Sequence, residues 1–261
     1  MLNRHFLLTG FALLLISGCK ANSIDFAKME SSEKAFNERQ RKELVAYMSL
    51  ETMFPDRRVR ELADAAAKGK NEKLDELIAE GVDVNSRGTK DATPLFWAMK
   101  NDSIDGFKKL LELGADPNVI FGDGGTVIHW AVRLENSDFL RFALDYGGNP
   151  NLVAGQRRLT PLFKARGGDS INMLLKYGAD PNVQESRGNT PVIMAAGLGR
   201  YDIAYVLLNN GADYSLKNDF GENLLDRIAS MRNVFVSGSA QEKSLKQVIS
   251  WLSERGVKVP E

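Results

Sequence analysis

Apolar residues are distributed in two different ways along this chain. Residues 6–16 form one apolar run, whereas from about residue 57 onward short apolar groups recur between polar stretches. Several of these groups are centred on paired leucines, as at Leu110-Leu111, Leu174-Leu175 and Leu207-Leu208. The run is typical of a targeting segment. The recurring groups predict a series of short amphipathic helices.

Two phrases repeat across the later part of the chain. One phrase begins with glycine and continues with Asp or Asn; its glycines lie 33, 33, 31 and 33 residues apart, at Gly81, Gly114, Gly147, Gly178 and Gly211. The other begins with threonine, at Thr93, Thr126, Thr160 and Thr190, and three of these four are followed by proline. Thr caps a helix, Pro fits its first turn, and Gly ends a helix in a left-handed turn. Asp and Asn then favour a tight turn into the next unit.

This arrangement resembles the ankyrin repeat over about residues 57–261. The resemblance implies an all-α repeat solenoid of about six helix-turn-helix units with hairpin loops, preceded by an amphipathic helix. The first unit spans 57–89, with its first helix over Glu61 to Lys68. The last unit runs from Asn223 to Val259, with extra length expected near 230–242. The Thr160 unit is short, because Arg166-Gly167-Gly168-Asp169 replaces a full turn between its helices.

The amino terminus has the composition of a lipoprotein signal. Arg4 precedes the apolar run, which is too short to span a bilayer and ends in Leu15-Ile16-Ser17-Gly18-Cys19. This ending resembles the lipobox of bacterial lipoproteins, which implies a signal peptide over 1–18 and lipidation of Cys19. A plain secretory signal is the alternative. Lys20 follows the modified cysteine, and by the sorting rule of enteric bacteria this favours the outer membrane, facing the periplasm.

Residues 19–56 separate the signal from the repeats. Phe36, Leu44, Tyr47 and Met48 fall at helical spacing, which predicts a lipidated tether followed by one amphipathic helix. The chain then breaks at 54–56, where Asp56 is placed to cap the next helix. The helix either covers the first repeat or folds onto a partner.

Composition excludes several kinds of chemistry. The 34 basic and 34 acidic residues give no basic surplus for nucleic acid. One Cys and two His supply neither an internal disulfide nor a Cys/His zinc site. The resemblance gives His129 a structural role at a helix start, and Trp97 and Trp130 are expected in the core. The glycines of 122–125 lack the Lys-Ser/Thr of a phosphate loop. No enzyme activity, metal or cofactor is therefore expected.

A protein-binding surface is the remaining prediction. Ankyrin arrays bind through hairpin tips and through the ends of the first helices, which line a concave face. Carried over unit by unit, these positions are Lys90, Lys100, Asn101, Asp123, Arg133, Leu134, Gln156, Arg157, Arg158, Arg187, Asn189, Leu198 and Phe220. Six of them are basic and one is acidic, which favours an acidic partner over an ordinary solvated surface.

The combination of lipobox, charged amino-terminal segment and repeats resembles immunity proteins that neutralise phospholipase toxins delivered by type VI secretion. This resemblance implies a protein partner, a phospholipase effector, bound in the periplasm by a lipid-anchored inhibitor with no homo-oligomer. An envelope scaffold or regulatory lipoprotein that binds a resident partner is the alternative, and a stress-protection chaperone is a third possibility.

Overall fold

A computed structural model of the chain describes residues 48–122, 124–231 and 234–259. All described residues belong to one compact unit. The predicted signal peptide, the lipidation site at Cys19 and most of the predicted amino-terminal helix lie outside the described residues. The same is true of Asp123.

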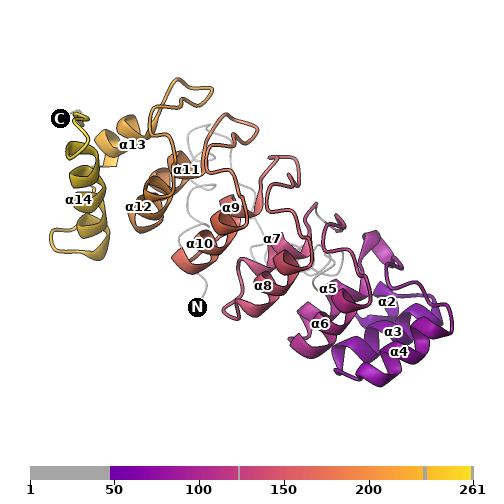
Figure 1. Cartoon of the computed structure of the whole chain (residues 1–261). Coiled ribbons are helices and arrows are strands. Elements are labelled where there is room, and N and C mark those ends of the chain that lie inside the picture. Colours follow the sequence, from indigo (N-terminus) through magenta and orange to yellow (C-terminus); the bar gives the residue numbers. More distant parts are fainter. Residues whose placement is uncertain (1–47, 123, 232–233, 260–261) are drawn as a thin grey trace, which may run out of the picture. The chain divides into compact units, whose positions relative to one another are not determined.

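Six consecutive helix pairs make up the described part of the chain (Figure 1). A four-residue helix, α2 (Leu50–Met53), precedes them, and a 3₁₀ turn, η2 (Thr89–Asp91), follows the first pair. The pairs are α3 (Arg57–Ala67) with α4 (Asn71–Ala79), α5 (Pro94–Lys100) with α6 (Ile104–Glu112), α7 (Val127–Ala131) with α8 (Asp138–Asp145), α9 (Pro161–Lys164) with α10 (Gly168–Lys176), α11 (Pro191–Gly197) with α12 (Tyr201–Asn209), and α13 (Leu224–Met231) with α14 (Ala240–Ser253). The predicted all-α repeat architecture of six units is thereby confirmed.

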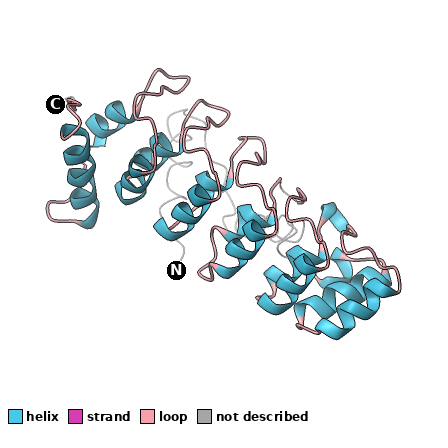
Figure 2. Cartoon of the chain, viewed as in Figure 1, coloured by secondary structure: helices cyan, strands magenta, loops and turns pink. Residues whose placement is uncertain are grey.

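Long hairpin loops connect each pair to the next (Figure 2). Within the described ranges these loops contain η2 and the isolated β-bridges of Phe121 with Gly125 and of Ala154 with Leu159, but no strand. The loops therefore owe their shape to turns and to contacts between neighbouring units.

Asp56 and Thr93 cap their helices as the sequence predicts, whereas Thr160 makes no side-chain cap bond at the start of α9. Asp56 accepts hydrogen bonds from the backbone N–H groups of Arg58 and Val59 at 2.9 and 3.0 Å. Thr93 accepts one from Phe96 at 3.2 Å, and the following proline stands in the first turn of α5. These caps satisfy amides that have no partner inside the helix. The range expected for the first helix, Glu61–Lys68, is wrong at its start. The cap at Asp56 starts α3 four residues earlier, at Arg57.

A repeated side-chain contact joins each unit to the next. Asn118 donates through Nδ2 to the carbonyl of Gly147 at 3.0 Å and accepts through Oδ1 from the N–H of Asn149 at 2.7 Å. Gly147 has a φ of 87°, the left-handed conformation that glycine adopts at least cost. We call this pair of bonds the inter-unit amide bridge. It recurs at Asn85, Asn151 and Asn182.

Apolar faces of successive pairs form one buried cluster from Met48 to Leu252. α3 packs against both α5 and α6, and α12 packs against α14. Phe107 and Phe139, from α6 and α8, meet edge to face with ring centroids 5.1 Å apart. No single pair could bury its apolar face alone, so stacking of neighbours supplies the core.

The fourth and sixth units differ from the others. In the fourth, α9 has only four residues, and α10 already begins at Gly168 with Gly167 as its cap. The connection between the two helices is thus short, as the sequence predicts for this unit. In the sixth, the extra length is shared between the connection after α13, described over 234–239, and α14, which has 14 residues. Phe235 from this connection packs on Tyr201, with centroids 5.9 Å apart.

Candidate protein-binding surface

Neighbouring hairpin tips are tied together through their backbones. The N–H of Gly122 donates to the carbonyl of Lys90 at 2.8 Å. Ser186 donates to Arg157 at 3.0 Å, and Asp219 to Arg187 at 3.1 Å. The carbonyls of three predicted basic residues thus accept bonds from the next hairpin, while their side chains are exposed. Backbone bonding holds these tips in a fixed order along the array.

A buried carboxylate, Glu185, lies beneath the fourth and fifth tips. Its side chain is fully buried, accepts a hydrogen bond from Asn189 Nδ2 at 2.7 Å, and pairs with the half-exposed Arg157 at 3.4 Å. Burial opposes ionisation of Glu185, but the Asn189 hydrogen bond, the Arg157 charge and backbone N–H groups outweigh it. Together they hold the pKa of Glu185 below its usual value. The carboxylate is therefore charged and fixed at neutral pH.

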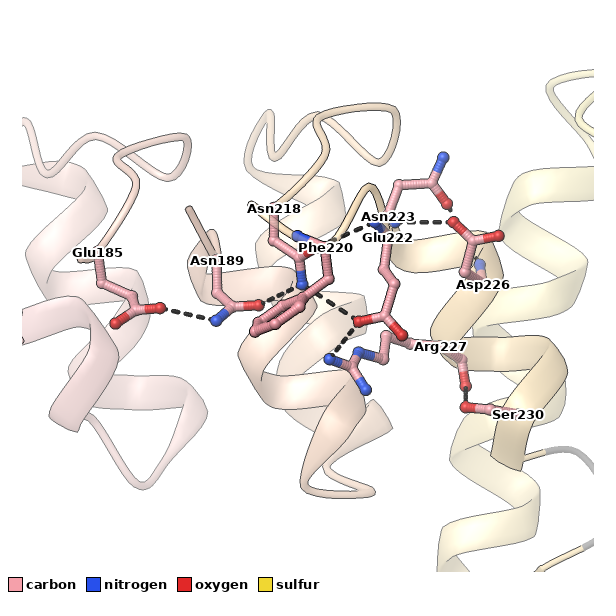
Figure 3. Close-up of polar contacts among 9 residues, drawn as sticks. All are labelled: Glu185, Asn189, Asn218, Phe220, Glu222, Asn223, Asp226, Arg227 and Ser230. Atoms are coloured by element: carbon pink, nitrogen blue, oxygen red, sulfur yellow. Dashed lines mark hydrogen bonds and ion pairs between the residues drawn. The ribbon is translucent and has the colours of Figure 1, made fainter. Parts of the chain in front are cut away.

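The polar contacts continue from Glu185 into the last unit (Figure 3). Asn189 Oδ1 accepts from Asn218 Nδ2 at 2.8 Å, and the same amide reaches Glu222 at 3.3 Å. Glu222 in turn forms an ion pair with Arg227 at 2.7 Å. These contacts connect six residues one after another, and we call them together the polar chain: Arg157, Glu185, Asn189, Asn218, Glu222 and Arg227.

The polar chain positions an exposed aromatic residue. Asn218 is buried, and its Oδ1 accepts from the backbone N–H groups of Phe220 and Glu222, both at 3.0 Å. These bonds fix the turn that carries Phe220, whose side chain is 70% exposed. A large apolar side chain on a fixed turn is suited to contact with another protein. We call Lys90, Gln156, Arg157, Arg158, Arg187 and Phe220 the tip surface.

The remaining predicted binding residues lie elsewhere or are engaged within the chain. Arg133, Leu134 and Leu198 are exposed at the turns inside their helix pairs. Asn101 donates to the carbonyl of Trp97 at 2.8 Å. Lys100 donates to the carbonyl of Met48 at 2.7 Å and lies 4.2 Å from the Trp97 ring centroid. Burial lowers the pKa of Lys100, as expected for a lysine that holds two segments of its own chain together.

His129 has the structural role expected of it. Its Nδ1 bonds the backbone N–H and hydroxyl of Thr126 at 3.1 and 3.0 Å, and Nε2 lies 3.0 Å from the carbonyl of Leu159. Burial lowers its pKa to about 4 despite the hydrogen bond to Leu159. The Nδ1 contact with a backbone N–H requires a lone pair there, so the proton of the neutral ring is on Nε2.

The two tryptophans are not equivalent. Trp97 is buried and meets Phe54 edge to face, as a core residue should. Trp130 is only half-buried; it packs against Phe96 with centroids 5.5 Å apart and faces Arg133. The expectation of a core position is therefore correct for Trp97 and only partly correct for Trp130. Their equal place in the repeat did not reveal this difference.

Sequence reasoning found the exposed tips but missed the polar chain beneath them. Glu185, Asn218 and Glu222 are ordinary polar residues in the sequence, in no motif that marks them. A signal was nevertheless available, because Glu185 and Asn218 lie 33 residues apart, as do Asn189 and Glu222, and 33 is the repeat period. Within the described ranges, no group of three or more His, Cys, Asp or Glu side chains could hold a metal ion.

Paired helices joined by hairpins with exposed tips define a helical repeat protein. The chain belongs to the ankyrin-repeat family: the family model described as ankyrin repeats (3 copies) matches residues 62–154 and 128–218. Ankyrin repeats are protein-interaction modules, typically without enzyme activity, and this chain is a protein-binding module of that kind.

The curated proteins similar to this chain match it over only a small part of their own length. The ADP-ribosylation factor GTPase-activating protein AGD4 of Arabidopsis thaliana is 36% identical over 66 residues, which cover 24% of this chain and 8% of that protein. The palmitoyltransferase AKR1 of Lachancea kluyveri is 31% identical over 154 residues, covering 56% of this chain and 21% of that protein. The chain thus matches no more than about a fifth of either relative.

Solved structures match over nearly their whole length. One comes from the complex of the Bd0816 predatory endopeptidase of Bdellovibrio bacteriovorus with the immunity protein Bd3460. It is 24% identical, has a TM-score of 0.58, and the match covers 72% of this chain and 97% of that chain. An ankyrin repeat domain of Acinetobacter baumannii AYE is 21% identical with a TM-score of 0.61, over 76% and 98%. These likenesses support the fold.

No helix in the described ranges is long and apolar enough to cross a membrane.

Proposed function

We propose that this chain is a lipid-anchored periplasmic immunity protein that binds and occludes a phospholipase toxin delivered by type VI secretion. The observation that carries the proposal is the tip surface: exposed basic side chains on hairpins tied to one another, ending in the exposed Phe220. The sequence contains no recognisable catalytic motif. Inhibition is therefore stoichiometric and depends on coverage of the toxin.

The charge of the tip surface suits rapid capture of an acidic partner. Four of its six members are basic: Lys90, Arg157, Arg158 and Arg187. Such a field raises the rate of encounter with an acidic protein. Phe220 supplies apolar contact area of the kind that dominates binding energy. Because the polar chain already fixes the turn at Phe220, little conformational freedom is lost on binding.

The endopeptidase complex supports the immunity class in general terms. In that complex, an immunity protein of similar fold is bound to a predatory endopeptidase. A repeat array of this type is thus suited to inhibit a secreted or delivered hydrolase. An endopeptidase is accordingly the second candidate target for this chain.

The place of action follows from the chemistry of the proposed toxin. A phospholipase delivered to the periplasm meets the cell's own lipid there, so an inhibitor is useful on that side of the membrane. The lipobox-like Leu15 to Cys19 would provide the anchor. Several acyl chains on one cysteine give stable attachment where a single chain is marginal.

The test combines purified proteins with cells. Purified protein is added in increasing ratio to phospholipases and to endopeptidases of the same genome, and inhibition should be complete near equimolar protein for one phospholipase. A deletion strain should lose in growth competition against its parent when the toxin is delivered, and the intact gene should restore survival. Equal competition together with no inhibited phospholipase would reject the proposal and favour the envelope-scaffold alternative. Inhibition of an endopeptidase alone would change the target class.

A further inference from the structure

The fourth unit is built with a missing helical turn. Its first helix, α9, has four residues, whereas α5 and α11 have seven. Thr160 precedes Gly178 by 18 residues, whereas Thr190 precedes Gly211 by 21. The chain leaves α9 at Lys164 and turns directly into α10, while the neighbouring α11 continues to Gly197. A hollow of about 200 Å³ remains between α9 and the α11–α12 pair, and we call it the notch.

The notch has an apolar interior. Its walls include Leu162 from α9, Met194 from α11, and Ile203 and Leu207 from α12. At its rim, Leu198 is 69% exposed, a large apolar area for one surface side chain. Its volume lies below the roughly 300 Å³ at which small-molecule sites begin. The notch is therefore of a size for one large apolar side chain and not for a cofactor.

The charges around the notch all have one sign. Lys164, Arg166 and Arg200 line it, and none of the described acidic residues does. Arg200 donates through Nη2 to the carbonyl of Arg166 and lies 3.6 Å from Asp202, which fixes its guanidinium near the rim. Arg166 is exposed, and its side chain forms no hydrogen bond or ion pair with the part of the chain that the structure describes.

Two neighbouring hollows lack this charge pattern. One of about 400 Å³ is lined by Arg133 and Arg166 but also by Glu135 and Asp169. The other, of about 440 Å³, has Arg200 together with Asp202. Basic and acidic side chains are thus balanced in both. Only the notch, among these three, combines an apolar interior with an entirely basic rim.

We propose that the notch is a docking site for a protein segment that inserts one leucine, phenylalanine or methionine side chain flanked by aspartate or glutamate. The apolar side chain fills the space left by the short α9. The flanking carboxylates meet Arg166 and Arg200, in charge-assisted hydrogen bonds that favour Arg as the donor. The inference depends on neither a toxin nor a lipid anchor, so it can fail or succeed independently of the proposed function.

A labelled peptide tests the inference directly. The probe is a fluorescein-labelled peptide with a central Leu-Phe pair between paired aspartates, titrated against the full chain in phosphatidylcholine nanodiscs with anisotropy as the readout. Empty nanodiscs give the blank. Replacing the aspartates by asparagine, or Leu-Phe by Ser-Ser, should weaken binding by at least about tenfold. No binding of the parent peptide at millimolar protein, or equal binding of all three peptides, would overturn the proposal.

Matched variants locate the binding site. Leu198→Ser should weaken binding of the probe at least about tenfold, and Arg166→Glu at least about fivefold. Leu134 stands at the same repeat position as Leu198 but lines the mixed-charge hollow, so Leu134→Ser should bind like the parent. All three side chains are exposed, and circular dichroism should report unchanged helix content. Equal loss in Leu134→Ser and Leu198→Ser would overturn the assignment to the notch.

A lipid is the alternative occupant of the notch. Sodium decanoate offers an acyl chain and one carboxylate, and is titrated as a competitor against the bound peptide. Displacement of the peptide by decanoate at a lower concentration than by unlabelled peptide would reject a protein segment as the natural occupant. Weaker competition by decanoate than by unlabelled peptide is the expected result.

Discussion

Asn218 donates a hydrogen bond to Asn189 at 2.8 Å, although the two residues lie on successive hairpins, 29 positions apart. The contact links the buried Glu185 on one side to the Glu222–Arg227 ion pair on the other. At the same time Asn218 fixes the backbone of the turn that carries Phe220. One buried amide thus connects the stability of two repeats to the presentation of an exposed aromatic residue.

Replacing Asn218 by alanine should therefore lower the free energy of unfolding. The change leaves Asn189 and two backbone N–H groups without their present partners, and each buried unpaired group costs about 1–3 kcal/mol. We expect a loss of about 2–4 kcal/mol by urea denaturation. Asn210→Ala is the matched control, because Asn210 is exposed and bonds mainly within its own helix. Equal stability of the two variants would contradict a connecting role for Asn218.

The buried His129 should make stability depend on pH. Its pKa is about 4 in the folded chain against 6.5 when unperturbed. Between these values the unfolded chain binds more protons, so stability should fall as pH drops from 6.5 toward 4, and it is fully present above 6.5. The expected loss at pH 4 is about 3 kcal/mol.

Denaturant titrations at pH 7, 5.5 and 4.5 measure this dependence. His129→Phe is the comparison variant, since Phe96 occupies the equivalent position in the second unit and is buried there. The variant is compared by its slope against pH and not by its absolute stability, because it also loses the bonds to Thr126 and Leu159. A parent and variant with the same slope would rule out His129 as the source.

Lys100 should hold the beginning of the described chain against the second unit. Lys100→Met keeps the apolar stem but removes the hydrogen bond to the Met48 carbonyl and the contact with the Trp97 ring. We expect faster amide exchange in residues 49–53, with exchange in α11 and α12 unchanged. Lys108→Met is the control, because Lys108 pairs with Glu112 on the surface of its own helix. Unaltered exchange at 49–53 would show that apolar packing alone holds the segment.

The repeat architecture could be predicted from sequence because its signals are local and periodic. Thr93 caps a helix through its own side chain, and Gly147 ends a unit through its own φ angle. Each needs only its neighbours in the chain, and each recurs at a fixed spacing. The same reasoning placed the exposed tips, including Phe220, correctly on the hairpins.

The supporting contacts could not be predicted because they depend on distances between units. Glu185 is buried by the packing of two hairpins, and no motif in the neighbouring sequence indicates this burial. The engagement of Lys100 requires Met48, 52 positions away, to pass beside α5. The notch is an intermediate case, because the three-residue shortening was visible in the sequence but its volume and basic rim were not.

The lipid anchor can be tested by one substitution. Cys19→Ser removes the thiol that lipidation requires, since Cys19 is the single cysteine of the chain. The variant should lose its membrane association in cell fractionation, while the parent remains with the membranes. A Ser17→Ala variant keeps a small residue before the cysteine and should fractionate like the parent. Membrane association of Cys19→Ser equal to that of the parent would reject the lipobox interpretation.

Reversing a basic charge of the tip surface tests its role in binding, and the choice of residue must take account of Glu185. A glutamate at Arg157 would stand beside a buried carboxylate that Arg157 now neutralises at 3.4 Å. Charge reversal at Arg157 should therefore lower both the melting temperature and the affinity for the partner, so a loss of binding could not be separated from a loss of stability. Arg187 avoids this difficulty, because it is exposed and only its backbone carbonyl bonds the neighbouring tip. Arg187→Glu is accordingly the cleaner charge variant.

Phe220 provides the most direct test of the tip surface. Phe220→Ala should weaken inhibition of the target by about 2 kcal/mol or more, roughly thirtyfold, because aromatic side chains that become buried at an interface dominate its energy. The melting temperature should stay nearly constant. The Phe220 side chain is 70% exposed, and the turn is held by the bond from the backbone N–H of residue 220 to the side chain of Asn218, which the substitution keeps. Val236→Ala is the matched control, because Val236 is 78% exposed but lies on the connection after α13, outside the tip surface. If Phe220→Ala inhibits the target as well as the parent, while Val236→Ala does not, the partner binds near the last unit and the hairpin tips are not its site.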